Sequence, residues 1–153
     1  MEVHMLKVSL SLNPKESEMF ELMLRLLYIE TLGHDGSFAH IHPVNLCQSK
    51  NPRLKRVGYL LTTLCINRES KLSILMLSTI QKDLASTNLH HVMYCLTALP
   101  KLLNKTIIEG SVEPLVKLLK HPTDLVRKKT LIALQKIHEL QPAVLPTYKT
   151  YLQ

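Results

Sequence analysis

Histidine and cysteine are the side chains of this sequence that are best suited to bind a metal ion. Four of them lie close together in the sequence: His34, His40, His42 and Cys47. On a helix, side chains that share one metal ion are three or four residues apart, so the rings of His40 and His42 point to different faces. His91 and Cys95 have the right spacing but no third ligand within reach. The spacing therefore predicts no metal site.

The sequence has none of the short motifs that position reactive groups for catalysis or phosphate binding. It has neither a glycine-rich phosphate loop nor the Gly-X-Ser-X-Gly turn of serine hydrolases, and it contains only 4 glycines in all. We therefore expect no catalytic residues, no cofactor and no small-molecule substrate, and we predict that the chain is not an enzyme.

Basic side chains are a further candidate group, because the chain carries a formal net charge of +7. One cluster comprises Lys50, Arg53, Lys55 and Arg56. A second comprises Lys117, Lys120, Arg127, Lys128 and Lys129. Such clusters can attract anionic lipid, at about 1 kcal/mol for each basic residue near the surface. Ordinary solvated charge is the alternative. Nucleic acid is not expected, because no aromatic residues that could stack on bases lie between the charges.

The composition favours a helical domain that would position these residues. The chain has 153 residues, of which 46% are hydrophobic and 20% charged, which is enough to build a core. Few glycines and few aromatics argue against a β-sandwich or barrel, which needs many tight turns. No apolar run approaches the roughly 20 residues that span a bilayer. The 3 cysteines lie far apart in apolar segments, so reduced thiols in the cytosol are expected.

Helix starts recur along the chain at a regular interval. Asn13, Asn51, Asn88 and Thr123 are separated by roughly 35 to 38 residues, and each is followed by two expected helices. A period of this length with two helices per unit is typical of HEAT and armadillo repeats. The pattern predicts a right-handed all-α solenoid of about four hairpins over residues 14–153. An ordinary helical bundle is the alternative that could produce the same spacing.

The expected helices follow from apolar residues at helical spacing and from polar residues that can cap the helix start. They are Lys15–Leu32, Ser37–Cys47, a helix from Asn51, Lys71–Ala85, helices from Asn88, Ser111 and Pro122, and Ala143–Leu152. Residues 1–13 do not fit this pattern, because their apolar residues partly alternate. We expect this segment to be a strand or an irregular lead-in outside the solenoid.

Two motifs resemble the early trunk of adaptin large subunits. The first is Leu-Leu-Tyr-Ile-Glu-Thr-Leu-Gly-His-Asp at residues 26–35, followed by Phe38. The second is Lys-Arg-Val-Gly-Tyr-Leu at residues 55–60, with Lys-Asp-Leu further along. Ser-Thr-Asn-Leu at residues 86–89 is most similar to the epsilon type, whereas Leu-Gly-His-Asp is alpha-like, and the gamma type stays open. The resemblance covers roughly residues 18–150, the opening part of such a subunit, and predicts a fragment or short form.

This resemblance implies a subunit without catalysis in a heterotetrameric vesicle-coat adaptor complex, with beta-type, medium and small adaptin chains as partners. Such a complex acts in intracellular protein transport and vesicle-mediated transport. The epsilon type is associated with the trans-Golgi network, which implies a cytoplasmic chain bound peripherally to its cytosolic face. The resemblance also implies docking to an ADP-ribosylation-factor GTPase.

Alignment of the motifs places three aliphatic residues at the positions where related chains contact the GTPase. They are Ile41, Val44 and Ile74. Exposed aliphatic side chains at these positions would suit the apolar centre of an interface, and packing in the core is the alternative.

A free-standing HEAT- or armadillo-like scaffold that binds peptides is the competing interpretation. Armadillo transport receptors usually present arrays of Trp and Asn to the peptide backbone, and this chain has no Trp. The lack of Trp favours the adaptor subunit. Co-purification with a small and a beta-type adaptin chain would distinguish the two interpretations.

Overall fold

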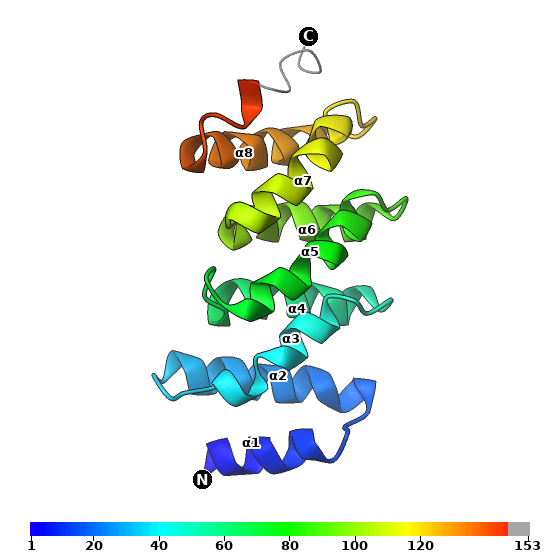
Figure 1. Ribbon diagram of the computed structural model, residues 1–153. Helices are drawn as coiled ribbons and strands as arrows, with labels where there is room; N and C mark the ends of the chain where they lie inside the picture. The colour runs from blue at the N-terminus through cyan, green and yellow to red at the C-terminus, as the bar shows by residue number, and fades with distance from the viewer. Residues whose placement is uncertain (147–153) are drawn as a thin grey trace. The chain divides into compact units, whose positions relative to one another are not determined.

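Helices make up all of the regular structure in residues 1–146, the residues described by this computed structural model (Figure 1). The chain divides into two compact units, Met1–Asn67 and Arg68–Gln153. The first unit contains α1 (Glu2–Ser11), α2 (Glu16–Thr31), the short 3-10 helix η1 (Ser37–Ala39), α3 (Ile41–Leu46) and α4 (Pro52–Cys65). The second contains α5 (Lys71–Leu84), α6 (Leu89–Leu102), α7 (Lys105–Leu118) and α8 (Asp124–Leu140). No helix in the described part of the chain combines the length and the apolar character needed to cross a membrane.

In the first unit, α2 packs against both α1 and α4. The α3 helix pairs with α4, and η1 contacts α1 and α3. Apolar side chains at helical spacing fill the shared core, which contains Leu6, Leu10, Leu22, Met23, Leu26, Ile29, Ala39 and Leu61. This core fixes the end of α2 and the position of η1, next to the polar residues of the candidate site.

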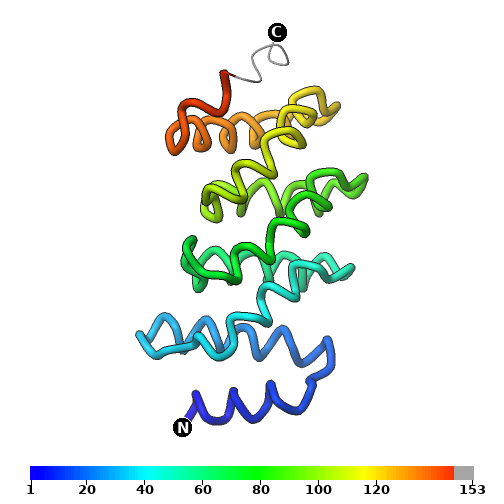
Figure 2. Tube along the Cα trace, in the orientation of Figure 1, coloured from blue at the N-terminus to red at the C-terminus, as the bar shows by residue number. Residues whose placement is uncertain are grey.

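In the second unit, the helices pair and then stack. The α5 helix pairs with α6 and α7 pairs with α8, and Figure 2 shows the chain reversing direction within each pair. In turn, α5 packs against α7 and α6 packs against α8, so the four helices form two layers. Hairpins that stack in two layers are the arrangement of an α-solenoid, and the predicted fold class is therefore confirmed.

Polar N-caps start several helices where the sequence predicted them. In three cases the side chain accepts a hydrogen bond from the backbone N–H two residues further on. These caps are Asn51, Ser70 and Asn88. Thr123 precedes α8, also as predicted. The start predicted at Asn13 is wrong, because this residue has a φ of 50° and α2 begins later, at Glu16.

The irregular lead-in expected for residues 1–13 is wrong, because most of this segment forms the helix α1. Leu6 and Leu10 are four residues apart on one face of α1, and both are buried in the core shared with α2. The partial alternation of apolar residues indicated a strand, in which every second side chain lies on the same face. Met5 and Val8 belong to that alternation, yet both are exposed. Burial of one leucine stripe therefore determines the conformation of the segment.

The helix start predicted at Ser111 is also wrong, because α7 begins earlier, after the cap residue Asn104. Pro114 therefore lies inside the helix, where it cannot donate a hydrogen bond to the carbonyl of Gly110. The side chain of Gln81 on α5 replaces that bond, since its Nε2 atom donates to the Gly110 oxygen at 2.9 Å. A bond from the neighbouring helix thus accommodates a proline in the middle of α7.

Of two other predicted helices, one is interrupted in the structure and the other lies mostly outside the described residues. The helix expected over Ser37–Cys47 is interrupted, because η1 ends at Ala39 and α3 begins at Ile41, with His40 at the joint. The interruption brings the His40 ring to the end of α2, where it forms a hydrogen bond. The amphipathic stretch predicted at Ala143–Leu152 lies mostly outside the described residues.

Asn104 joins three segments of the second unit, and its loss is expected to destabilise that unit. Its Oδ1 atom accepts from the backbone N–H of Ile107 at 2.9 Å, and its Nδ2 atom donates to the carbonyl of Arg68 and the hydroxyl of Ser73. A helix cap contributes about 1 kcal/mol, and each further hydrogen bond contributes about as much. The Asn104→Ala variant should therefore lose about 2–3 kcal/mol of unfolding free energy in a urea titration followed by circular dichroism.

The matched control for this prediction is Asn88→Ala. The Asn88 side chain caps α6 by accepting from the backbone N–H of His90 at 3.0 Å, and no second segment is joined to it in the described part of the chain. We expect this variant to lose only about 1 kcal/mol. Equal losses for the two variants would contradict the joining role of Asn104.

Candidate functional site

The Lys-Arg-Val-Gly-Tyr-Leu motif at residues 55–60 lies on α4, where this helix packs against α3. A Cβ atom at Gly58 would lie 2.7 Å from the backbone nitrogen of Cys47 and 2.8 Å from the carbonyl carbon of Leu46. Side-chain carbons do not approach backbone atoms this closely, so the contact requires glycine. The motif therefore encodes a close crossing of two helices.

Lys55 of the same motif lies inside the first unit, with only 3% of its surface exposed. Its ammonium group donates a hydrogen bond to the carbonyl oxygen of Cys47, just past the end of α3. It also lies 5.7 Å from the centroid of the buried Tyr59 ring. A cation is favourable both at a helix C-terminus and over an aromatic ring. The expectation that Lys55 faces lipid is corrected by this burial, since its charge is used within the fold.

The other three residues of that basic cluster, Lys50, Arg53 and Arg56, are exposed. The guanidinium group of Arg53 lies 5.4 Å from the centroid of the Phe20 ring, at an open cleft between the starts of α2 and α4. The cleft is lined by Glu16, Ser17, Phe20, Asn51, Arg53 and Leu54. Because the N-terminal end of a helix also carries positive potential, this end of α4 presents a cationic surface to solvent.

The second basic cluster is partly neutralised by carboxylates of its own helices. The Nζ atom of Lys117 lies 2.9 Å from the carboxylate of Glu113, one turn earlier on α7. Arg127 forms an ion pair with Asp124 and donates to carbonyl oxygens of the turn before α8. These charges are therefore partly balanced, and the first cluster is the stronger candidate for an anionic partner.

The three aliphatic candidates for GTPase contact differ in exposure. Ile41, at the start of α3 in the first unit, is 36% exposed, and Ile74, on α5 in the second unit, is 55% exposed. Val44 is only 1% exposed, which places it in the core. The expectation that Val44 forms part of an exposed contact is therefore corrected, whereas Ile41 and Ile74 both present aliphatic carbon to solvent.

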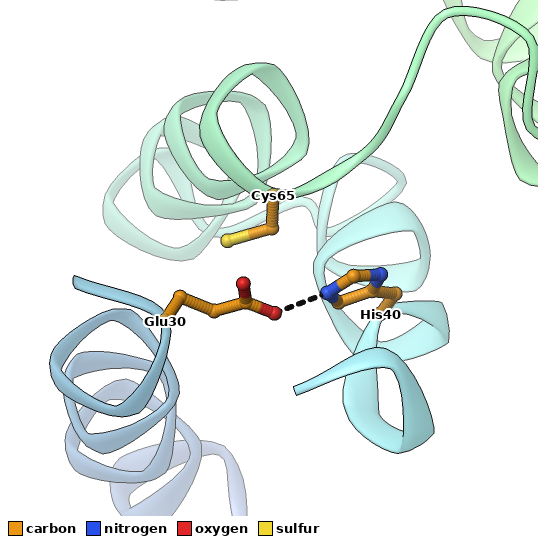
Figure 3. A group of neighbouring side chains, drawn as sticks. All are labelled: Glu30, His40 and Cys65. Atoms are coloured by element: carbon orange, nitrogen blue, oxygen red, sulfur yellow. Dashed lines mark hydrogen bonds and ion pairs between the residues drawn. The ribbon is translucent and has the colours of Figure 1, made fainter. Parts of the chain in front are cut away.

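Three partly buried side chains of the first unit converge on one point (Figure 3). They are Glu30 near the end of α2, His40 at the joint between η1 and α3, and Cys65 at the end of α4. The Nε2 atom of His40 lies 2.5 Å from the Oε1 atom of Glu30, which is a strong hydrogen bond. Burial and the neighbouring Glu30 carboxylate raise the pKa of the Cys65 thiol to about 11, so the thiol is protonated at neutral pH.

Sequence reasoning missed this cluster because its members lie on three elements that are far apart in the sequence. The pair considered from the sequence, His40 and His42, does not meet there, since His42 is not among the converging side chains. Burial lowers the pKa of His42 below the ordinary value for histidine. No short-range spacing in the sequence signals the contact of His40 with Glu30 and Cys65.

Comparison with known proteins identifies the family of this chain. The family model described as the adaptin N terminal region matches residues 2–151. The chain belongs to the adaptin family. The match begins at residue 2, so α1 lies inside the adaptin region, which agrees with its packing on α2.

Individual adaptins of the epsilon type are similar to this chain. It is 43% identical over 126 residues to the AP-4 complex subunit epsilon of Arabidopsis thaliana, a match that covers 82% of this chain and 13% of that protein. It is 39% identical over 124 residues to AP-4 complex subunit epsilon-1 of Homo sapiens, covering 81% of this chain and 11% of that protein. The corresponding subunit of Dictyostelium discoideum is 32% identical over 139 residues, covering 91% and 13%. The resemblance to the epsilon type is therefore confirmed, and the chain spans 11–13% of these relatives' length.

The fold is also similar to part of one chain in a larger adaptor assembly. A chain of a structure described as a homology model of the full-length AP-3 complex in an intermediate open conformation superposes with a TM-score of 0.77. The match covers 90% of this chain and 24% of that chain, at 23% sequence identity. At this identity the similarity concerns the fold alone, and it agrees with the helical stacking seen within each unit.

Proposed function

We propose that this chain acts as the N-terminal part of an epsilon-type adaptin large subunit in a heterotetrameric vesicle-coat adaptor complex. Its role is non-enzymatic: it scaffolds beta-type, medium and small adaptin chains in intracellular protein transport and vesicle-mediated transport. The observation that carries the proposal is 32–43% identity to AP-4 complex subunits named epsilon, over 81–91% of this chain. Stacked helical hairpins support it, because they expose long faces on which other chains can assemble.

Co-expression tests this proposal directly. The tagged chain is co-expressed with a small and a beta-type adaptin chain, purified, and analysed by gel electrophoresis and size-exclusion chromatography. We expect one or both adaptin chains to co-elute with the tagged chain. Recovery of neither would contradict the scaffolding role and would favour a free-standing scaffold that binds peptides.

The proposed site of action is the cytosolic face of the trans-Golgi network, reached through peripheral contacts. An ADP-ribosylation-factor GTPase is the first proposed contact. Exposed Ile41 in the first unit supports it, because the centres of such interfaces are usually apolar, and exposed Ile74 is a separate candidate in the second unit. Anionic lipid is the second, and the exposed residues Lys50, Arg53 and Arg56 support it by their charge. Buried Val44 and Lys55 would affect these contacts only through the fold.

The Ile41→Asp variant is expected to bind the GTP-locked factor roughly tenfold more weakly or worse, because a carboxylate would be buried in an apolar contact. The affinity is measured by surface plasmon resonance on the chain co-purified with its adaptin partners. The Leu131→Asp variant is the control, since Leu131 is also an exposed aliphatic residue and lies on α8. Equal affinities for the wild-type chain and the Ile41→Asp variant would remove Ile41 from the proposed contact.

Neutralising the exposed basic cluster is expected to weaken binding to anionic vesicles. A variant with glutamine at Lys50, Arg53 and Arg56 loses three charges at about 1 kcal/mol each, which corresponds to roughly a hundredfold loss of affinity at low salt. The measurement is co-flotation with vesicles that contain phosphatidylserine and a phosphoinositide, over a range of salt concentrations.

The control for vesicle binding removes the same number of charges from the second unit. Lys71, Lys82 and Lys105 are all exposed, so glutamine at these positions changes the net charge equally. We expect this control to lose much less affinity than the variant in the first unit. Equal losses would mean that net charge alone drives the binding, and the cluster would not be a site.

A further inference from the structure

The point where Glu30, His40 and Cys65 meet has the composition of a transition-metal site. One carboxylate oxygen, one imidazole nitrogen and one sulfur all lie within 4.8 Å of one another. Figure 3 shows the three side chains approaching from three separate segments, with the Cys65 sulfur above the Glu30 carboxylate and the His40 ring to its right.

Packing around the cluster positions the donor side chains. Gly36 has no side chain, and a Cβ atom there would collide with the Glu30 carboxylate oxygen and would lie 2.8 Å from the Cδ1 atom of Leu26. Ala39, next to His40, is fully buried in the core. The glycine thus leaves room for the carboxylate, and the core fixes the backbone that carries the imidazole. Donors on packed elements are held more accurately than donors on free loops.

We propose that Glu30, His40 and Cys65 together bind one divalent transition-metal ion of the zinc type. Thiolate and imidazole ligands favour Zn²⁺ over Mg²⁺ and Ca²⁺, which prefer oxygen ligands alone. Three protein ligands leave a fourth tetrahedral position, which water fills. The ion ties the end of α2, the start of α3 and the end of α4 together, and it stabilises the first unit through binding to the folded state.

Only small side-chain movements are needed to form this site. Ligand bonds of about 2.0–2.3 Å place tetrahedral donor atoms roughly 3.3–3.6 Å apart. The Nε2 atom of His40 and the Oε1 atom of Glu30, now 2.5 Å apart, must separate slightly, while the Cys65 sulfur moves closer. The thiol proton leaves to solvent as the metal–sulfur bond forms. The proton that Nε2 donates to the Glu30 carboxylate must also leave to solvent, and the neutral imidazole then carries its proton on Nδ1, so that Nε2 offers its lone pair to the ion.

Cobalt substitution tests the proposal on the full chain with its cysteines kept reduced. Co²⁺ is titrated and the absorption spectrum is recorded, and Zn²⁺ is then added as a competitor. We expect one Co²⁺ per chain, intense visible bands of tetrahedral cobalt, and a near-ultraviolet band from thiolate-to-cobalt charge transfer that Zn²⁺ abolishes. Absence of the charge-transfer band from the wild-type chain would overturn the proposal.

Variants assign the ligands. Cys65→Ser should lose the charge-transfer band, and His40→Gln and Glu30→Gln should each weaken Co²⁺ binding roughly tenfold or more. His42→Ala and Cys95→Ala are the controls, and both should keep the wild-type spectrum. A band that persists in Cys65→Ser, or that is lost in Cys95→Ala, would place the ion elsewhere and overturn the assignment.

A measurement on the wild-type chain keeps the proposal testable if a variant fails to fold. Alkylation of each cysteine by a maleimide is followed by mass spectrometry, with and without Zn²⁺. Zinc should slow the labelling of Cys65 by roughly tenfold or more, because a metal-bound thiolate is not free to react. Unchanged labelling of Cys65 at saturating Zn²⁺ would overturn the proposal.

Discussion

The Gly58→Val variant is expected to lose about 3 kcal/mol or more of unfolding free energy in the first unit. The added Cβ atom would lie 2.7 Å from the backbone nitrogen of Cys47. Backbone cannot rotate away as a side chain can, so α3 and α4 must move apart and lose their packing. The measurement is a urea titration followed by circular dichroism, and Gly58→Ala should fall between the valine variant and the wild-type chain.

A second glycine inside a helix provides the control. A Cβ atom at Gly110 would lie 2.5 Å from the Cδ1 atom of Leu77 and 3.1 Å from the Nε2 atom of Gln81. Both atoms are at the ends of flexible side chains, which can shift. Alanine also favours a helix over glycine by about 1 kcal/mol, so Gly110→Ala should stay within about 1 kcal/mol of wild type. If Gly58→Val were as stable as Gly110→Ala, the close crossing of α3 and α4 would be contradicted.

The Lys55→Glu variant is the second change for which we expect a large effect, a loss of about 3–5 kcal/mol of unfolding free energy. The buried ammonium group would be replaced by a carboxylate that faces the carbonyl oxygen of Cys47. Two acceptors then oppose each other in the interior, and a buried charge loses its partner. Thermal and urea unfolding, both followed by circular dichroism, measure the loss.

The neighbouring residue gives a matched comparison, because Arg56 is exposed and carries the same charge. Arg56→Glu should change the unfolding free energy by no more than about 0.5 kcal/mol, as is usual for surface substitutions. It should instead weaken binding to anionic vesicles. If Lys55→Glu left stability intact and reduced vesicle binding as Arg56→Glu does, Lys55 would belong to the lipid surface after all.

Local signals allowed much of this fold to be predicted from the sequence. Asn51, Ser70 and Asn88 start helices as expected because capping depends on a side chain and the backbone just after it. The interval between such caps indicated paired helices, which the structure confirms in the second unit. The Ser111 start was wrong for a tertiary reason, since the bond from Gln81 accommodates a proline inside α7.

The candidate sites were less predictable, because exposure depends on what packs against each side chain. Nothing in the sequence separates Lys55 from Arg56, yet one is buried over Tyr59 and the other faces solvent. Val44 and Ile41 are likewise both aliphatic residues of α3 with opposite exposure. The meeting of His40 with distant partners depends on the break between η1 and α3, and periodicity alone predicted one continuous helix there.

The contacts of Asn104 also bear on how the chain folds during its synthesis. Its side chain donates to the carbonyl of Arg68 and to the hydroxyl of Ser73, groups at the start of α5 that are made well before residue 104. While the ribosome is still adding α6, the Ser73 hydroxyl can already bond to the carbonyls of Arg68 and Ser70, but the bonds from Asn104 are missing. The α5–α6 hairpin therefore gains its last hydrogen bonds only when the beginning of α7 emerges. Formation of this hairpin would then overlap with the synthesis of the next one.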